Sequence, residues 1–216
     1  ETPEGGSVGV VKNLALSSHI TKYSDVVILY NILKDLLCIT KIVDSNPCDI
    51  VSQYKIFING NWDFCTNKPK YVVQHLRHLR RIGVVHIHTS IVWKHLDRVI
   101  ELYTDAGRCT RPLYIVKKNK LMITNEHLDK IDRGTIGWKN MILGSLNDGG
   151  IKHKPITEGV IEFIDVQEQD QCLVAVNKKR LGKKIKNMIS SYTHCEIHCA
   201  FQTGVMASVI PFIDHN

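Results

Sequence analysis

The chain contains 216 residues, 44% of them hydrophobic, which is enough to bury the core of one or two compact domains. Lys and Arg outnumber Asp and Glu by 28 to 21, and the net charge of +7 favours a polyanionic partner, although a solvated basic surface gives the same composition. No signal-peptide pattern is present, and polar residues interrupt the most apolar stretch, residues 26–42, so we expect neither secretion nor membrane insertion. Seven cysteines, an odd number, indicate free thiols in a reducing compartment.

The first forty residues predict a buried segment and a helix. Residues 8–16 are mostly apolar and are expected to be buried, so Lys12 and Asn13 within them need polar partners. Apolar residues recur at helical spacing in residues 26–40, with Lys34 on the opposite face, and this pattern predicts a helix.

A hairpin and a basic helix are predicted next. Residues 56–58 form an apolar strand pattern that runs into Asn59-Gly60, and these two residue types tolerate the positive φ of a tight hairpin turn. Residues 71–81 place their apolar side chains on one stripe and predict an amphipathic helix that ends near Gly83. Its arginines lie mainly off the stripe and predict either a solvated face or a nucleic-acid contact: Arg77, Arg80 and Arg81.

The middle of the chain is rich in strand patterns. Alternating, β-branched or aromatic residues predict strands at residues 85–88, 91–93, 99–103 and 113–116.

Short helices and a strand pair are expected beyond this point. Thr124 or Asn125 can cap a helix that continues through Ile131, and residues 138–143 predict another. Residues 160–164 and 172–176 are expected to pair as strands joined by an acidic turn.

A cationic run follows the last of these strands. Charges this dense are stable only in water or against phosphate, and we expect a solvated connector rather than a nucleic-acid contact. The run consists of Lys178, Lys179, Arg180, Lys183, Lys184 and Lys186.

The His194–Cys199 cluster has the residue types of a zinc site, but its spacing argues against one. In a strand, His194, Glu196 and His198 would share one face, while the two cysteines would face the other way. His86 and His88 would also share a strand face without a third ligand. Phosphate-binding glycine loops and nucleophile–base arrangements are missing from the sequence, so we expect no self-contained active site and no metal held by this chain.

Several short strings occur in a fixed order: Glu1–Gly5, Val11–Leu14, Asn59–Trp62, Leu76–Gly83, Thr104–Arg108, Gly159–Asp165, Thr193–His198 and Ile210–Asn216. In this order they resemble landmarks of the second-largest subunit of multisubunit DNA-directed RNA polymerase, along nearly the whole chain. The resemblance implies an internal fragment of that subunit, with an α+β, multidomain fold of strand-rich external domains and short helices. It assigns residues 1–20 to the end of the fork region, 21–98 to the external 1 domain, 99–190 to the external 2 domain and 191–216 to the start of the hybrid-binding domain.

The resemblance also implies a function in DNA-templated RNA synthesis, with this chain inactive alone and forming one wall of the active-centre cleft. Metal-bound carboxylates of the largest subunit, with Mg²⁺, would perform nucleotidyl transfer, and Zn²⁺ could be bound elsewhere in the full subunit. Implied partners are the largest and smaller subunits, template DNA and product RNA, with no membrane. The residues expected near the active centre are Glu4, Lys12, Asn13, His215 and Asn216.

Departures from the family pattern suggest a divergent polymerase. Cys199 and Ile213 stand where the family usually has Pro, and the cationic run replaces a connector that is often acidic. We interpret these as features of a large DNA virus, which implies the host cytoplasm or nucleus and the virion as locations; a cellular protein would be nuclear. The alternative functions are a free-standing basic nucleic-acid-binding module and a zinc-dependent hydrolase.

Overall fold

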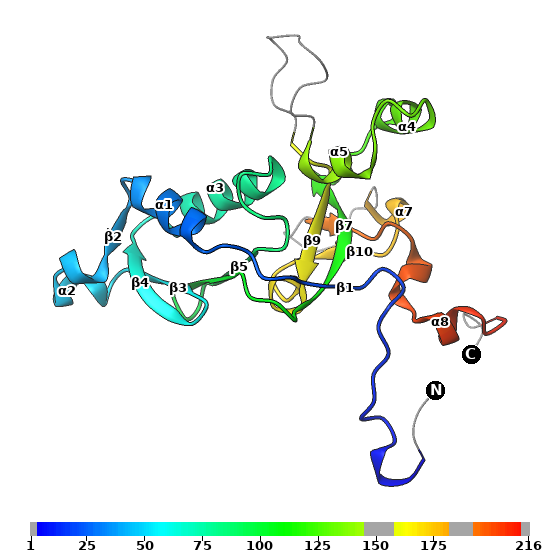
Figure 1. Cartoon of the computed structure of the whole chain (residues 1–216), viewed down its shortest axis with the longest axis horizontal. Coiled ribbons are helices and arrows are strands. Elements are labelled where there is room, and N and C mark those ends of the chain that lie inside the picture. Colours follow the sequence, from blue (N-terminus) through cyan, green and yellow to red (C-terminus); the bar gives the residue numbers. More distant parts are fainter. Residues whose placement is uncertain (1–3, 145–157, 182–191, 213–216) are drawn as a thin grey trace.

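The computed structural model describes residues 4–144, 158–181 and 192–212, and it contains two β-sheets that lie side by side, each with its own helices (Figure 1). We define the first lobe as residues 21–103, and the second lobe as residues 104–212 together with strand β1 (His19–Ile20). The mixture of sheets and short helices confirms the predicted α+β class. Within the described ranges, every helix is too short or too polar to cross a membrane.

The sheet of the first lobe has five strands in the order β2-β4-β3-β6-β5. Only β3 and β6 are parallel neighbours. The predicted hairpin is confirmed, since Asn59 and Gly60 join β3 to β4 with φ of 48° and 87°. The sheet continues to Tyr103, so the domain boundary expected at residue 98 falls inside it. The strand bounds are β2 Ile39–Lys41, β3 Tyr54–Ile58, β4 Asn61–Thr66, β5 Ser90–Lys94 and β6 Val99–Tyr103.

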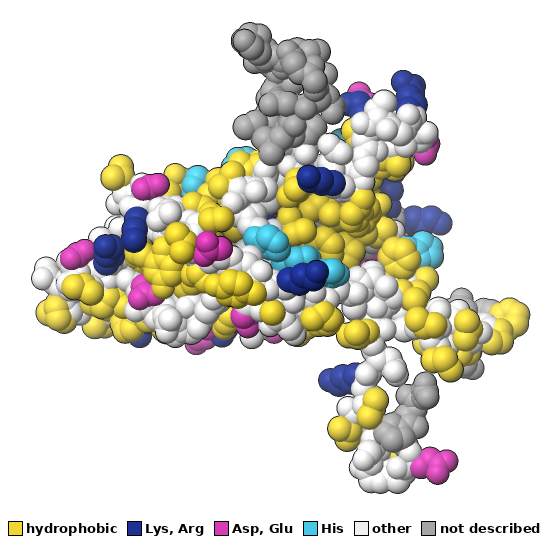
Figure 2. All heavy atoms as spheres, in the orientation of Figure 1, with side chains coloured by type: hydrophobic (Ala, Val, Ile, Leu, Met, Phe, Trp, Pro, Cys, Tyr) yellow, Lys and Arg dark blue, Asp and Glu magenta, His cyan; other side chains and the backbone are white. Residues whose placement is uncertain are grey.

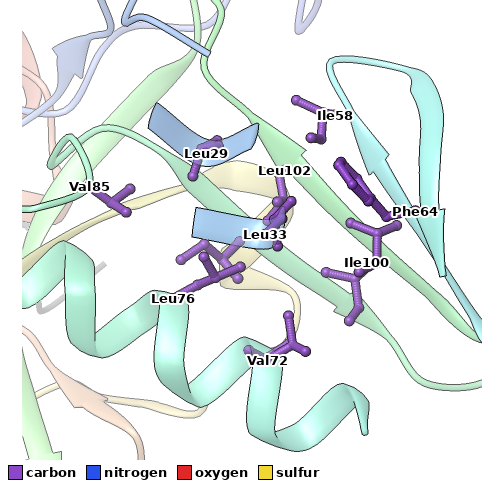
Figure 3. Packing of buried hydrophobic residues seen from close by; sticks show 12 residues of the cluster. Leu29, Leu33, Ile58, Phe64, Val72, Leu76, Val85, Ile100 and Leu102 are labelled. Carbon is purple, nitrogen blue, oxygen red and sulfur yellow. The ribbon is translucent and has the colours of Figure 1, made fainter. Parts of the chain in front are cut away.

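Two helices cover one face of this sheet: α1 (Val27–Asp35) and α3 (Pro69–Arg81). Helix α3 confirms its prediction, whereas the helix predicted over residues 26–40 ends at Asp35, because the chain turns into strand β2. Their apolar stripes pack onto alternate strand residues, and Figure 3 shows the helix side chains meeting those of the sheet. Helix α3 ends, as expected, before Gly83, which has φ of 82°. Two shorter helices, η2 (Ile42–Asp44) and α2 (Pro47–Ile50), lie between β2 and β3. The core includes Leu29, Leu33, Ile56, Phe64, Val72, Leu76 and Leu102.

The sheet of the second lobe is built around β7, which pairs with four other strands. Strands β10 and β11 are parallel to each other, and β11 is antiparallel to β7. The bounds are β7 Cys109–Lys117, β8 Lys120–Leu121, β9 Ile161–Asp165, β10 Val174–Ala175 and β11 His194–Cys195.

The pairing predicted between residues 160–164 and 172–176 is wrong. Strand β9 pairs with β7, while β10 pairs with β11. The expected acidic turn is instead the helix α6 (Val166–Gln169), because the carboxylate of Asp165 accepts a hydrogen bond from the backbone of Glu168 and caps the helix.

The predicted short helices of the second lobe are confirmed. Thr124 and His127 form a capping box at the start of α4 (Asn125–Asp132), and α5 spans Trp138–Leu143. The remaining helices are η1 Gly5–Ser7, α7 Lys178–Leu181, η3 Cys199–Gln202 and α8 Val205–Ser208.

Three further expectations are wrong. Residues 85–88 form turns rather than a strand, because the chain reverses after Gly83 and Thr89 donates to the carbonyl of His86. Residues 8–16 are largely exposed, since few described residues pack against them. Strand β11 ends at Cys195, so the alternation expected through residue 199 breaks down and leaves His198 exposed.

Candidate functional site

A buried network of charges joins the two lobes. Arg80 on α3 is only 2% exposed, because it extends from the first lobe into the second. Its Nε donates to Oε1 of Glu162 at 3.0 Å, and its Nη1 and Nη2 donate to the carboxylate of Glu168 at 2.8 and 2.9 Å. Nη1 also donates to the carbonyl of Thr89. One guanidinium therefore holds helix α3 to strand β9 and helix α6.

Glu162 extends the network towards the C-terminal part of the chain. Its second oxygen, Oε2, accepts a hydrogen bond from Nη2 of Arg81 at 2.8 Å and lies 3.3 Å from Nε2 of His194 on β11. Since Glu162 is 4% exposed, this carboxylate connects α3 to β11 away from solvent.

The network favours the charged forms of Glu162 and Arg80. Burial would raise the pKa of Glu162, but Arg80 and Arg81 hold it well below its usual range. Burial would likewise lower the pKa of Arg80, but Glu168 and Glu162 raise it. Burying ions costs several kcal/mol each, so such a network fixes one arrangement of its elements more than it adds stability.

Two further arginines extend this ionic contact around β7. Arg108 binds Asp165 at 2.9 Å and Asp105 at 2.8 Å, and it donates to the carbonyl of His88. Arg111 pairs with Glu196, directly after β11. The N-terminal cap of α6 is thus bound by the residue that precedes β7, and the segment after β11 is bound by a residue of β7 itself.

Two family models match the chain: "RNA polymerase Rpb2, domain 4" over residues 56–117 and "RNA polymerase Rpb2, domain 5" over residues 154–198. Similar proteins include DNA-directed RNA polymerase II subunit RPB2 of Encephalitozoon cuniculi, which is 38% identical over 220 residues, and RNA polymerase II subunit 2 of Arabidopsis thaliana, 34% identical over 221 residues. The chain is also 30% identical over 221 residues to RNA polymerase III subunit RPC2 of Drosophila melanogaster. Each of these alignments covers 100% of the chain. The chain belongs to the family of second-largest RNA polymerase subunits.

The matches cover 18%, 18% and 17% of these three relatives, so the chain spans less than a fifth of their length. The buried network joins the two matched domains of this polymerase-subunit chain. Arg80 lies in the domain 4 match, whereas Glu162, Glu168 and His194 lie in the domain 5 match.

The arginines of α3 correct one interpretation of the sequence. Arg80 and Arg81 neither form a solvated face nor are available to nucleic acid, because carboxylates of the second lobe hold them. Arg77 is 29% exposed, and its Nε lies 3.5 Å from Oε1 of Glu168. These contacts remove the basic helix as support for a free-standing nucleic-acid-binding module.

Some of the residues expected near the active centre of a polymerase subunit lie beside the C-terminal segment. Leu16 donates its backbone N–H to the carbonyl of Thr203 at 2.9 Å, and Asn13 and Leu14 lie against Gly204. Lys12 is exposed in the same N-terminal segment, and Glu4 is exposed at the N-terminal cap of η1. His215 and Asn216 lie outside the described residues.

Sequence reasoning missed the acidic half of the network. One residue could have indicated it: Glu162 places a carboxylate inside the otherwise apolar strand pattern of residues 160–164. A charge buried in such a strand requires a partner of opposite charge. Glu168 lies in the segment for which the sequence predicts an acidic turn.

The His194–Cys199 cluster, which has the residue types of a zinc site, is divided between different environments. His194 is engaged by Glu162 and by the hydroxyl of Thr193 at 3.0 Å, while Cys195 is buried and Cys199 is exposed. Across residues 4–144, 158–181 and 192–212, no three His, Cys, Asp or Glu side chains are grouped as metal ligands would be.

Proposed function

We propose that this chain forms, within the second-largest subunit of a DNA-directed RNA polymerase, part of one wall of the active-centre cleft for DNA-templated RNA synthesis. The observation that carries the proposal is the similarity of the whole chain to RNA polymerase subunits. The chain is 38% identical over 220 residues to subunit RPB2 of Encephalitozoon cuniculi. Nucleotidyl transfer would be performed by carboxylates of the largest subunit that bind Mg²⁺, and the 216-residue chain would be inactive alone. Zn²⁺, if the full subunit binds it, would be held elsewhere.

The proposed task of the two lobes is to act as a rigid support. In this proposal the first lobe is the external 1 domain, residues 104–190 of the second lobe belong to the external 2 domain, and the buried network fixes the mutual arrangement of these two domains. The segments at residues 4–20 and 192–212 would be the parts that extend towards the cleft, as the end of the fork region and the start of the hybrid-binding domain.

The apolar side chains of these two segments support their burial in a larger assembly. Val10 and Phe212 are each 72% exposed, and Val209 is 73% exposed. Monomeric proteins rarely leave such groups of large apolar residues in water, so contact with further polymerase surface accounts for them.

The proposed active-centre residues are Glu4, Lys12 and Asn13, together with His215 and Asn216. A carboxylate in the fork segment can orient cationic groups that meet the incoming nucleotide or the RNA product. The partners would be the largest and smaller polymerase subunits, template DNA and product RNA. The location would be the nucleus for a cellular enzyme, and the host cytoplasm or nucleus and the virion for a viral one; the viral origin stays a prediction.

Purification of the full-length subunit that contains this sequence tests the proposal. We expect it to co-purify with a largest subunit and to support template-dependent RNA synthesis, whereas the 216-residue chain alone makes no RNA. RNA synthesis by the isolated chain would contradict the proposal, and so would a full-length protein that purifies without other subunits. In the assembled enzyme, Glu4→Ala should lower the elongation rate without reducing assembly.

A further inference from the structure

A hollow of about 360 Å³ opens in the second lobe, between the β8–α4 segment on one side and the β10–α7 and β11–η3 segments on the other. Its walls are mainly apolar, and two of the lining side chains are well exposed, Leu128 at 46% and Val176 at 41%. The other apolar lining residues are Tyr114, Leu121, Ile123 and Ile197.

Two basic segments that are far apart in the sequence meet beside this hollow. Leu121, which follows the β7–β8 turn, packs against the buried cluster that includes Leu181 of α7, and Leu121 and Lys178 of α7 both line the hollow. Figure 2 shows Lys and Arg side chains on the side of the second lobe that carries α4 and α7. The exposed cations are Lys118 of the turn, Lys120 of β8, and Lys178, Lys179 and Arg180 of α7.

These five cations are not neutralised by the part of the chain that the structure describes, where none of them forms a salt bridge. By contrast, Lys117 at the end of β7 pairs with Glu158 at 2.8 Å. The turn also has a defined shape, because Lys118 and Asn119 both have positive φ, 51° and 58°, as a two-residue hairpin loop requires. The backbone that carries Lys118 therefore has a defined conformation.

The opposite side of the hollow has a different charge. Helix α4, which lines it through Asn125 and Leu128, carries the exposed acids Glu126 and Asp129. Glu196 also lines the hollow, but its carboxylate is occupied by Arg111. A ligand with negative charge would consequently be attracted to the α7 side and repelled from the α4 side.

We propose that this hollow binds a peptide segment of a protein partner, in which one large apolar side chain fills the hollow and neighbouring Asp or Glu residues face α7 and the β7–β8 turn. An apolar anchor in a hollow with a charged rim is a common arrangement at protein–protein contacts. Nucleic acid fits less well, because strand-binding surfaces stack successive bases on exposed aromatic rings, and the lining offers the half-buried phenol ring of Tyr114 and one exposed imidazole, that of His198. The inference goes beyond the proposed polymerase function, because it concerns a surface away from the fork segment.

A random peptide library displayed on phage, selected on the purified polymerase that contains the full-length subunit, tests this inference. A second selection uses the same enzyme with Leu128→Ser and Lys178→Glu, two changes at exposed side chains. We expect the wild-type enzyme to enrich peptides with Phe, Leu or Trp beside several acidic residues, and the double variant not to enrich them. Enrichment of the same peptides by both enzymes, or no acidic–apolar peptides from the wild type, would overturn the proposal.

Fluorescence anisotropy with one enriched peptide separates the two parts of the site. Leu128→Ser and Lys178→Glu should each weaken binding by about tenfold, or about 1.4 kcal/mol. Leu96→Ser and Lys70→Glu, at exposed positions of the first lobe, serve as matched controls and should leave the affinity unchanged. A single-stranded DNA oligonucleotide is the competing probe. If it binds to the wild type and loses affinity in Lys178→Glu, while the peptide is unaffected by Leu128→Ser, the surface is a nucleic-acid contact and the peptide proposal is wrong.

Discussion

Gly159 crosses the end of helix α5 so closely that a Cβ at this position would lie 1.8 Å from the carbonyl oxygen of Ile142. The crossing is held by two backbone hydrogen bonds. Gly159 donates to the carbonyl of Arg81 at 3.0 Å, and Val160 donates to that of Met141 at 2.7 Å. This glycine thus allows β9 to begin between the last turns of α3 and α5, where Glu162 can reach the arginines.

Gly159→Ala should strongly destabilise the chain. The clash is with backbone atoms, which cannot turn away as a side chain can, so α5 or β9 must shift. We expect a loss of at least about 3 kcal/mol in the free energy of unfolding, the upper part of the usual range for over-packed sites. Urea unfolding of the 216-residue chain measures it. Gly6→Ala is the control, because that position has open space around it and should change stability little. Equal stability of the two variants would contradict the close approach.

Arg80→Met should be costly because it leaves two buried carboxylates without their main partner. Removing one member of a buried ion pair typically costs about 3–5 kcal/mol, and we expect a loss of this size. The double variant Arg80→Met/Glu168→Met should be more stable than the single variant, since Glu162 keeps Arg81 and His194. Urea unfolding of both variants checks the order.

An exposed pair provides the comparison for this prediction. Lys94 lies 2.8 Å from Glu101, but its side chain is 44% exposed, so Lys94→Met should change stability by less than about 1 kcal/mol. If Arg80→Met and Lys94→Met cost the same, the buried network does not hold the lobes together.

His88, one of the histidines grouped where the two lobes meet, should make stability depend on pH. Figure 2 shows them grouped there, and the ring of His88 stacks on that of His19 with centroids 4.8 Å apart. Burial, followed by His19, His86 and Arg108, lowers the pKa of His88 to about 4. Because the unfolded chain has a histidine pKa near 6.5, its His88 takes up a proton first as the pH falls. Stability should therefore decrease from about pH 6.5 to about pH 4.

His88→Phe tests this pH dependence, because it keeps a ring between His19 and Phe163 but removes the titrating group. Thermal unfolding midpoints measured between pH 7 and pH 4 should fall less steeply in the variant. The contribution of Glu162 lies in a separate window: its lowered pKa stabilises the fold above pH 4.5 and is lost only at lower pH. Parallel pH curves for wild type and variant would rule out a role of His88.

Local features of the fold could be predicted from the sequence, and distant pairings could not. The Asn59-Gly60 turn, the amphipathic helix α3 and the Thr124 cap each depend on residues within a few positions of one another, and all three are present. The partner of β9 is β7, about fifty residues earlier in the chain. An apolar strand pattern does not specify which strand it joins.

The charge network shows the same limit. A run of arginines on one helix has the same pattern whether it faces water, phosphate or carboxylates. The carboxylates that bind Arg80 in the structure, Glu162 and Glu168, lie more than eighty residues beyond it in the sequence. The order of its short motifs indicated the family, but the sequence did not reveal that the arginines of α3 are neutralised by carboxylates of the same chain.

Gly204→Ala should loosen the contact between the N-terminal and C-terminal segments. A Cβ at residue 204 would lie 3.0 Å from the carbonyl oxygen of Leu14 and 3.5 Å from the Cβ of Asn13, closer to the former than side chains normally approach. The N-terminal segment must then move away, which weakens the hydrogen bond from Leu16 to the carbonyl of Thr203.

Hydrogen exchange followed by mass spectrometry measures this at the amide of Leu16, which should exchange faster in the variant. Exchange at the amide of Ile115 is the internal control and should not change, because this amide donates to the carbonyl of Val160 and lies in β7 beyond the residues that pair with β1, Cys109 and Thr110. Unchanged exchange at Leu16 would show that the two segments are not held together by this close approach, and it would remove the structural reason for placing Lys12 and Asn13 beside the chain that leads to His215 and Asn216.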